Sequence, residues 1–325
     1  MKEYNDVALA SDFSIYTLSP ESMDCQMAKM AKAGFSHVHW AHDWDFEYLY
    51  SQWEILQIKE ILDRHGLKCK GVHASEGNTR CRVVDGVPRF LNRRKLPDCR
   101  KDFTSFTEYN RLAGMELVLN RVDLAAMLNG GEIVLHWVIP YEEFETPGFK
   151  EKYYEQAFKS FDEMESYCRA KGVRIAVENM ICTPAEYQFE EFDRLFERYS
   201  PEYIGFCLDI GHSALVCPEH DYAFAERYYE RIIAVHLHDN NLPDLSLSDD
   251  VDGAIQKSDI HRVPYDGKIN WDKTCEYIAK SPYELPLTLE CVVPYPSPEE
   301  EMRGLAKSLE IGRDLTKKVL RYRGK

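Results

Sequence analysis

The sequence lacks any apolar run close to the roughly 20 residues that a membrane-spanning helix needs. Residues 1–6 also lack the apolar core of a signal peptide. The ten cysteines include no Cys-x-x-Cys pair, and Cys207 and Cys291 fall inside predicted strands. We therefore interpret the cysteines as reduced thiols of the core and not as disulfides or zinc ligands. These absences predict a cytoplasmic protein that does not enter a membrane.

The sequence has fewer basic than acidic residues, with 40 Lys and Arg and 55 Asp and Glu, which gives a net charge of −15. Such a chain repels a phosphate backbone unless its basic residues gather on one face, so nucleic acid is not expected as a partner. A small molecule is the better expectation. No linker or shift in composition marks a second domain, and we expect residues 1–325 to form one domain. The oligomeric state stays open, and a homo-oligomer is compatible with the sequence.

What the sequence does have is a repeated unit, in which a helix with apolar residues at helical spacing is followed at once by an apolar strand. Glycine stands at four of the junctions, at Gly34, Gly66, Gly130-Gly131 and Gly172, where we expect the left-handed conformation that ends a helix. The predicted helices span 21–33, 52–65, 104–129, 151–171, 189–199, 221–231, 272–281 and 298–321. Eight strands alternating with eight helices predict an α/β fold, a single-domain (β/α)8 TIM barrel, with functional groups at the carboxyl ends of the strands.

An ionisable side chain ends several of the predicted strands. These strands are Ile175-Ala-Val-Glu178, Phe206-Cys-Leu-Asp209, Ile233-Ala-Val-His236 and Leu287-Thr-Leu-Glu290. Strand ends of a parallel barrel converge, and desolvated carboxylates that meet there need a cation to offset their repulsion. The sequence therefore predicts one divalent metal ion held by Glu178, Asp209, His236 and Glu290. The oxygen-rich ligand set favours Mn²⁺, with Zn²⁺, Mg²⁺ or Co²⁺ as alternatives.

Further imidazoles lie at or near strand ends, and we expect them to contact substrate: His73, His136, His212, His238 and His261. His236 and His238 are two residues apart on a strand and point to the same face. We favour His236 as the metal ligand, with His238 either supporting a ligand or touching substrate. A second or third metal ion held by these histidines is the alternative to hydrogen bonds with sugar hydroxyls.

The pair Glu178 and Glu290 suggests a reaction. A divalent ion bound to the carbonyl and neighbouring hydroxyl oxygens of a sugar makes the adjacent carbon-bound proton acidic. One carboxylate then removes this proton, and the other returns a proton to a different face or carbon. The predicted activity is the isomerisation or epimerisation of a sugar or sugar phosphate through an enediolate.

Two connections, at about 76–103 and 240–260, are longer than simple turns. Long loops at strand ends form lids or line pockets, although a solvated loop without function is the alternative for both. The second loop is polar and acidic. The first is basic and is a candidate for binding a phosphate or carboxylate group through Arg80, Arg82, Arg89, Arg93, Arg94, Lys95 or Arg100.

Five motifs resemble those of the xylose-isomerase-like TIM-barrel superfamily. They are Val177-Glu178-Asn179, Leu208-Asp209-Ile-Gly-His212, His236-Leu-His-Asp239-Asn, Asp259-Ile-His261-Arg-Val-Pro-Tyr-Asp-Gly267-Lys-Ile-Asn-Trp271 and Leu289-Glu290. This superfamily contains sugar and sugar-phosphate isomerases and epimerases, inosose dehydratases and endonuclease IV. The motifs are specific for the superfamily and not for the reaction.

Each branch of the superfamily implies a different use of these residues. The epimerase branch implies one metal ion, often manganese, on Glu178, Asp209, His236 and Glu290, with Glu178 and Glu290 also moving protons and His212 touching substrate. The ketose 3-epimerases place an arginine shortly after the metal histidine, whereas this chain has Asn240-Asn-Leu-Pro.

The endonuclease IV branch implies a trinuclear zinc site. The residue types and their order match at His73, His136, Glu178, Asp209, His212, His236, Asp259, His261 and Glu290. The acidic net charge opposes this zinc phosphodiesterase. Other members are lyases or dehydratases that act on keto-sugar derivatives, including C-glycosides. A barrel that has lost catalysis and binds sugars is the remaining alternative, and an isomerase or epimerase is the activity we expect.

Overall fold

The computed structural model describes residues 4–14, 19–43, 47–75, 101–181, 183–249, 251–293 and 297–324, together with the backbone of 81–84 and 87–90. Eight parallel strands form one sheet in the order β10-β1-β2-β3-β6-β7-β8-β9. The strands are β1 (Ala8–Ala10), β2 (His37–Trp40), β3 (Lys68–His73), β6 (Glu132–His136), β7 (Arg174–Glu178), β8 (Ile204–Asp209), β9 (Ile232–His236) and β10 (Thr288–Leu289).

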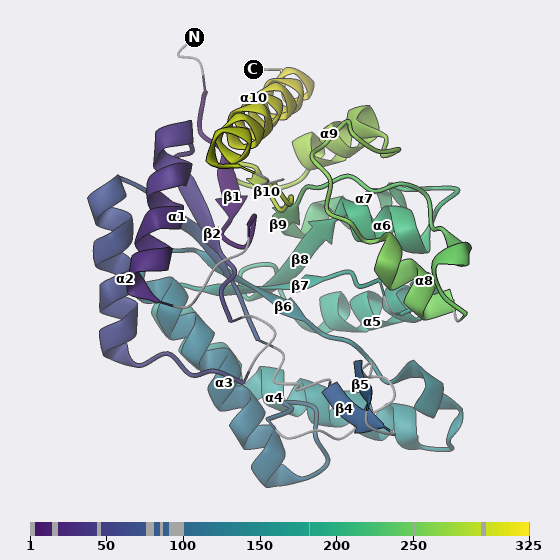
Figure 1. Cartoon of the computed structure of the whole chain (residues 1–325). Coiled ribbons are helices and arrows are strands. Elements are labelled where there is room, and N and C mark those ends of the chain that lie inside the picture. Colours follow the sequence, from purple (N-terminus) through teal and green to yellow (C-terminus); the bar gives the residue numbers. More distant parts are fainter. Residues whose placement is uncertain are drawn as a thin grey trace.

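The sheet closes on itself between β9 and β10. The Leu237 N–H donates to the carbonyl of Thr288 at 3.1 Å, and the Glu290 N–H donates to the carbonyl of Leu237 at 3.2 Å. Helices surround the cylinder in the way that alternation of strands and helices predicts (Figure 1). The predicted (β/α)8 barrel is therefore confirmed.

The outer helices follow the predicted segments closely. They are α1 (Pro20–Ala33), α2 (Gln52–His65), α3 (Glu108–Met127), α4 (Phe149–Lys171), α5 (Ala185–Arg198), α7 (Ala223–Tyr228), α9 (Trp271–Lys280) and α10 (Pro298–Tyr322). Serine side chains cap the first turns of α1, α2 and α10. No helix in the described ranges has the length and apolarity to cross a bilayer.

The glycine prediction is confirmed at three junctions and wrong at the fourth. Gly34, Gly66 and Gly172 follow α1, α2 and α4 with φ angles of 102°, 67° and 68°. At Gly130-Gly131 the helix ends earlier than predicted, and Asn129 takes the left-handed conformation with φ 60°. Asparagine tolerates this region better than other residues that have a β-carbon.

Several short elements were not predicted. They are a hairpin of β4 (Cys81–Val84) and β5 (Val87–Phe90), helix α6 (Ile210–Val216) directly after β8, and helix α8 (Val251–Ser258) inside the connection that was expected to be a polar loop. The basic side chains of the first long loop, from Arg80 to Arg100, lie outside the described residues.

Apolar side chains fill the barrel in two layers of packing. A large cluster lies between the strands and the helices, and a small one fills the inside of the cylinder with Val134, Ala176, Cys207, Ile233 and Ala234. A β-carbon on Gly205 would lie 2.6 Å from Cγ1 of Ile233, so the interior has no room for a larger residue there. The described cysteines are free thiols, most of them buried, as the sequence predicted.

Candidate active site

The four predicted metal ligands meet at the carboxyl end of the barrel. Glu178, Asp209 and His236 are the last residues of β7, β8 and β9, and Glu290 directly follows β10. One ligand atom from each lies within 4.8 Å of the others, and the four residues are 0–7% exposed. The structure therefore brings together four side chains that are far apart in the sequence.

The contacts of these side chains converge on one imidazole nitrogen. Nδ1 of His236 lies 3.1 Å from Oε1 of Glu178, 3.1 Å from Oε2 of Glu290 and 4.0 Å from Oδ2 of Asp209. A single N–H cannot satisfy three carboxylates, whereas a divalent cation prefers such a set of oxygen and nitrogen donors. The residues present therefore fit a divalent metal ion.

Charge and burial act in opposite directions on these groups. Burial by itself raises the pKa of Glu178, but the imidazoles of His236 and His136 outweigh it and hold that pKa well below its usual range. Burial is likewise outweighed by His236 at Glu290, whose pKa is lowered. Burial also lowers the pKa of His236, but Glu178 and Glu290 raise it well above its usual value. The two glutamates are thus held as anions in a buried site.

The Asp-Ile-Gly-His segment after β8 positions Asp209. Its Oδ1 accepts the N–H of His212 at 2.7 Å and so caps α6, while the side-chain amide of Asn179 bonds the backbone N–H and carbonyl of Asp209 at 2.9 and 2.8 Å. Nε2 of His238 lies 2.9 and 3.0 Å from the two carboxylate oxygens. A β-carbon on Gly211 would lie 2.0 Å from Cε1 of His238, so only glycine leaves room for this ring.

A second group, near the first, is built around Asp259. Oδ2 of Asp259 lies 3.3 Å from Nε2 of His212 and 3.1 Å from Nε2 of His261, and the ring of His238 stacks on that of His261 at 3.8 Å. Burial lowers the pKa of His261, but Asp259 raises it to about 10. The side-chain amide of Asn240 donates to Oδ1 of Asp259 at 3.0 Å. Asn240 thus holds the carboxylate of Asp259 in place.

A third group consists of His73, His136 and Glu178. Nε2 of His136 lies 3.1 Å and Nε2 of His73 lies 3.7 Å from Oε2 of Glu178. Burial and the neighbouring His136 lower the pKa of His73 to about 3. Each of the three groups has side-chain atoms close enough to share a metal ion.

A cavity of about 290 Å³ opens onto all three groups. Four of the five histidines that were predicted to touch substrate line it. His238 is fully buried against Asp209, outside the lining, in the supporting position that was the alternative to a substrate contact. The second long connection contributes Gln256 and Asp259. The complete lining is Asp12, His73, His136, Glu178, Met180, Ile181, His212, Gln256, Asp259, His261, Glu290 and Val292.

Sequence reasoning missed two residues of the site. His39, on β2, is buried with Nε2 3.3 Å from Nε2 of His236. Asp12, just after β1, lines the cavity, and burial together with the charge of Glu290 raises its pKa to about 7. Asp12 obeys the rule that found the others, because it follows the apolar strand β1, whereas His39 lies inside its strand.

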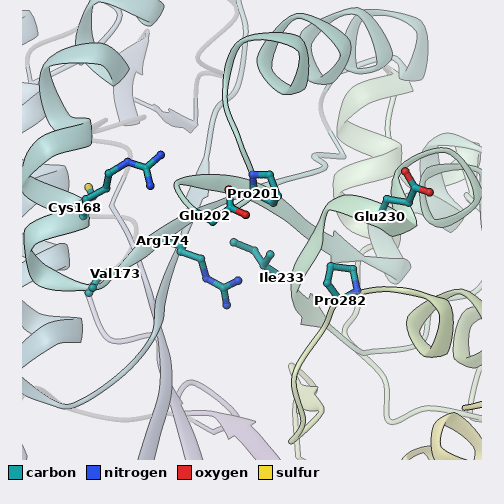
Figure 2. A pocket seen from close by; sticks show the side chains of 10 residues that line it. Cys168, Val173, Arg174, Pro201, Glu202, Glu230, Ile233 and Pro282 are labelled. Atoms are coloured by element: carbon teal, nitrogen blue, oxygen red, sulfur yellow. The ribbon is translucent and has the colours of Figure 1, made fainter.

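The opposite end of the barrel has a cleft of a different kind. This cleft has a volume of about 530 Å³. In Figure 2, Arg174 and Ile233 lie near Glu202, Pro201 and Pro282. Its lining contains no histidine. Histidines and buried carboxylates therefore gather around the cavity at the carboxyl end and not around this cleft.

The chain matches the model of the xylose isomerase-like TIM barrel family over residues 27–314. It belongs to this family. An uncharacterized protein of Sinorhizobium fredii, y4fM, is 34% identical over 262 residues, which cover 80% of this chain and 78% of that protein.

Two solved structures share the fold of this family member at low sequence identity. The first, a D-tagatose 3-epimerase-like protein, has a TM-score of 0.65 and 20% identity, with 98% of this chain and 99% of that chain covered. The second, D-psicose 3-epimerase of Clostridium cellulolyticum H10 with D-tagatose, has a TM-score of 0.64 and 13% identity, with 96% and 99% covered.

Proposed function

We propose that this family member is a divalent-metal-dependent isomerase or epimerase of a sugar or sugar phosphate. The observation that supports this most is the convergence of Glu178, Asp209, His236 and Glu290 at the base of a cavity. The names of the two similar structures, a D-tagatose 3-epimerase-like protein and a D-psicose 3-epimerase, agree with such a reaction.

In this proposal Glu178, Asp209, His236 and Glu290 hold the ion, for which their three carboxylates favour Mn²⁺. When bound, the ion polarises the carbonyl oxygen of the sugar and makes the neighbouring C–H acidic. Asp209 is kept in place by the α6 N–H, by Asn179 and by His238. His238 therefore orients a ligand and does not touch the sugar.

Glu178 and Glu290 carry the proton transfers. Both are ionised, so one can accept the proton from the substrate carbon and leave its electron pair in the enediolate. The other must first become protonated before it returns a proton to carbon. An imidazole lies near each for this purpose, His136 at 3.1 Å from Glu178 and His261 at 3.8 Å from Glu290.

The remaining lining residues bind the hydroxyl groups of the sugar. His73, His136, His212 and His261 offer ring nitrogens around the cavity. Asp12, with its pKa raised to about 7 by burial and by Glu290, is partly protonated near neutral pH and can donate a hydrogen bond to a sugar oxygen. A volume of about 290 Å³ suits a monosaccharide better than a longer chain.

The test is solvent deuterium incorporation into keto-sugars and their phosphates, with and without Mn²⁺. We expect deuterium at a carbon next to the carbonyl, in a reaction that depends on the metal. A lyase or dehydratase acting on a keto-sugar derivative begins with the same proton removal, and its products would differ by loss of water or of an aglycone. Absence of exchange across the panel in metal-loaded protein would contradict the proposal.

A zinc phosphodiesterase of the endonuclease IV kind is the second candidate. The two additional groups, around Asp259 and around His73 and His136, favour it because three clusters suit three ions. The net charge of −15 disfavours it, since DNA needs a phosphate-binding surface. Three zinc ions per chain with nicking of abasic DNA would establish this function. One ion per chain, with no DNA binding at low salt, would eliminate it.

A further inference from the structure

A second, more open groove of about 450 Å³ adjoins the substrate cavity. The two depressions share His261 and Val292, which form the boundary between them. The remaining groove residues are Ile260, Arg262, Val263 and Asp266. A ligand that fills the inner cavity can therefore extend over His261 into the groove.

The backbone that forms this boundary is held on both sides. Asp239 and Arg262 exchange N–H to carbonyl hydrogen bonds of 2.7 and 2.8 Å, and the Val292 N–H donates to the carbonyl of His261 at 2.9 Å. His261 has φ 46°, an uncommon left-handed value for a residue with a side chain, and its Nδ1 donates to the carbonyl of Glu290 at 2.9 Å. The imidazole thus faces the inner cavity, and its neighbours Ile260 and Arg262 form the groove.

The two depressions differ in chemistry. Acids and imidazoles line the inner cavity, whereas the groove has the aliphatic side chains of Ile260 and Val292, which are 39% and 49% exposed. Nη1 of Arg262 donates to the backbone carbonyl of Asp266 at 3.1 Å, which fixes the guanidinium along the groove. The carboxylate of Asp266 is paired with Lys307 at 2.8 Å.

An aromatic group fits this surface better than an anion does. A flat guanidinium beside aliphatic side chains offers a face on which an aromatic ring stacks. A phosphate group prefers several N–H donors or cations. Here one arginine stands with two exposed aliphatic residues, and a carboxylate belongs to the lining.

We propose that the groove is a subsite for an aromatic substituent of the sugar, so that the substrate is an aryl-substituted sugar. The sugar ring occupies the inner cavity, and the aromatic ring lies over Arg262 between Ile260 and Val292. This inference rests on the proposed function, because that function places the sugar in the cavity.

The test compares matched phenyl and methyl glycosides of several monosaccharides that are oxidised to a ketone at a ring carbon, so that a carbonyl beside a hydroxyl remains, by calorimetric binding to the Mn²⁺-loaded protein. We expect the phenyl glycoside to bind roughly tenfold more tightly, because its ring is removed from water when it covers the groove surface. The double variant Ile260→Ser and Arg262→Ser should lose most of this preference and keep its affinity for the methyl glycoside. Val251→Ser, at a 60% exposed position outside both linings, is the matched control and should keep the preference.

The outcomes separate this inference from the proposed function. Equal affinities of phenyl and methyl glycosides in the wild type would overturn the aromatic subsite and leave sugar binding intact. Tighter binding of sugar phosphates than of phenyl glycosides, lost in Arg262→Ser alone, would overturn it in favour of an anion. Failure of every glycoside, free sugar and sugar phosphate to bind would overturn the subsite and the proposed function together.

Discussion

The two ends of the barrel treat buried charge in opposite ways. At the amino end, Nζ of Lys70 on β3 lies 2.7 Å from Oε1 of Glu132 on β6, and the two side chains are 10% and 4% exposed. At the carboxyl end, Glu178, Asp209 and Glu290 surround the single ring of His236. At the amino end, Lys70 and Glu132 compensate each other's charge. At the carboxyl end, three carboxylates lie around one imidazole, and a bound cation would offset their repulsion. The first arrangement leaves each buried charge compensated, and the second suits a bound cation.

The largest expected effect is on turnover, in Glu178→Gln. Removing the charge of this glutamate removes a proposed metal ligand and a proposed proton acceptor, so we expect kcat to fall by at least about 10² to 10⁴. The circular dichroism spectrum and the cooperative melt should stay close to those of the wild type. Full activity in both Glu178→Gln and Glu290→Gln would rule out their part in proton transfer.

The matched change at the amino end is Glu132→Gln, the same substitution at the first residue of a neighbouring strand. It leaves the buried ammonium of Lys70 without its partner, so we expect the free energy of unfolding to fall by about 3 kcal/mol. The kcat of the remaining folded enzyme should not change. Denaturant melts together with a rate assay check both statements, and a loss of activity without a loss of stability would break the comparison.

A chelator should lower thermal stability only through the proposed metal site at the carboxyl end of the barrel. Mn²⁺ at about one hundred times its dissociation constant stabilises a folded protein by about 2.7 kcal/mol if the unfolded chain does not bind it. We therefore expect EDTA to lower the Tm of the wild type and of Glu132→Gln, and to have little effect on Glu290→Gln. Equal responses of the two variants would place the bound metal elsewhere.

A smaller effect is expected in the pH dependence of stability, because the histidines at the carboxyl end differ in pKa. Burial lowers the pKa of His42 to about 3, whereas Asp259 raises the pKa of His261 to about 10 against its burial. Because the unfolded chain binds a proton at His42 more readily, stability is lost as the pH falls below about 6.5. Between pH 7.5 and 5 this loss of stability amounts to about 2 kcal/mol.

Comparison of wild type and His42→Gln by denaturant melts at pH 7.5, 6.5 and 5 isolates that contribution. The difference in stability between the two proteins at pH 7.5 serves as the reference, since His42 is neutral there in both states. The wild type should lose about 2 kcal/mol more than the variant on acidification to pH 5. Parallel losses would mean that the neutral state of His42 is not required.

The regular alternation of apolar strands with amphipathic helices was sufficient to predict the barrel, because each repeated unit has only one way to bury its strand. Helix α6 was missed because Ile210–Val216 is short and follows Asp209 without a break, so its apolar residues read as part of a strand end. Helix α8 was missed because its eight residues are too few for a helical pattern to stand out in a segment that is polar and acidic overall. Short elements of this kind depend on tertiary contacts more than on propensity.

The site was predicted where a polar residue followed an unbroken apolar run. His39 escaped this rule because the pairing of β2 with β3 shifts register between Val38 and His39, and no alternation pattern reveals which face a residue takes after such a shift. The groove beside His261 could not be predicted from the sequence either. It depends on the left-handed backbone at that residue, which the sequence does not specify.

The strand that closes the barrel is only two residues long, and Glu290 is the residue that follows it. Glu290 is tied to β9 through Leu237 and to the neighbouring loop through His261, while α10 approaches β1 so closely that a β-carbon on Gly312 would lie 2.6 Å from Val7. The placement of Glu290 therefore depends on the same short segment that pairs with β1 and contacts Leu237. If Glu290 acts as proposed, a chain in which β10 has not yet joined β1 would bind the metal ion without one of its carboxylates.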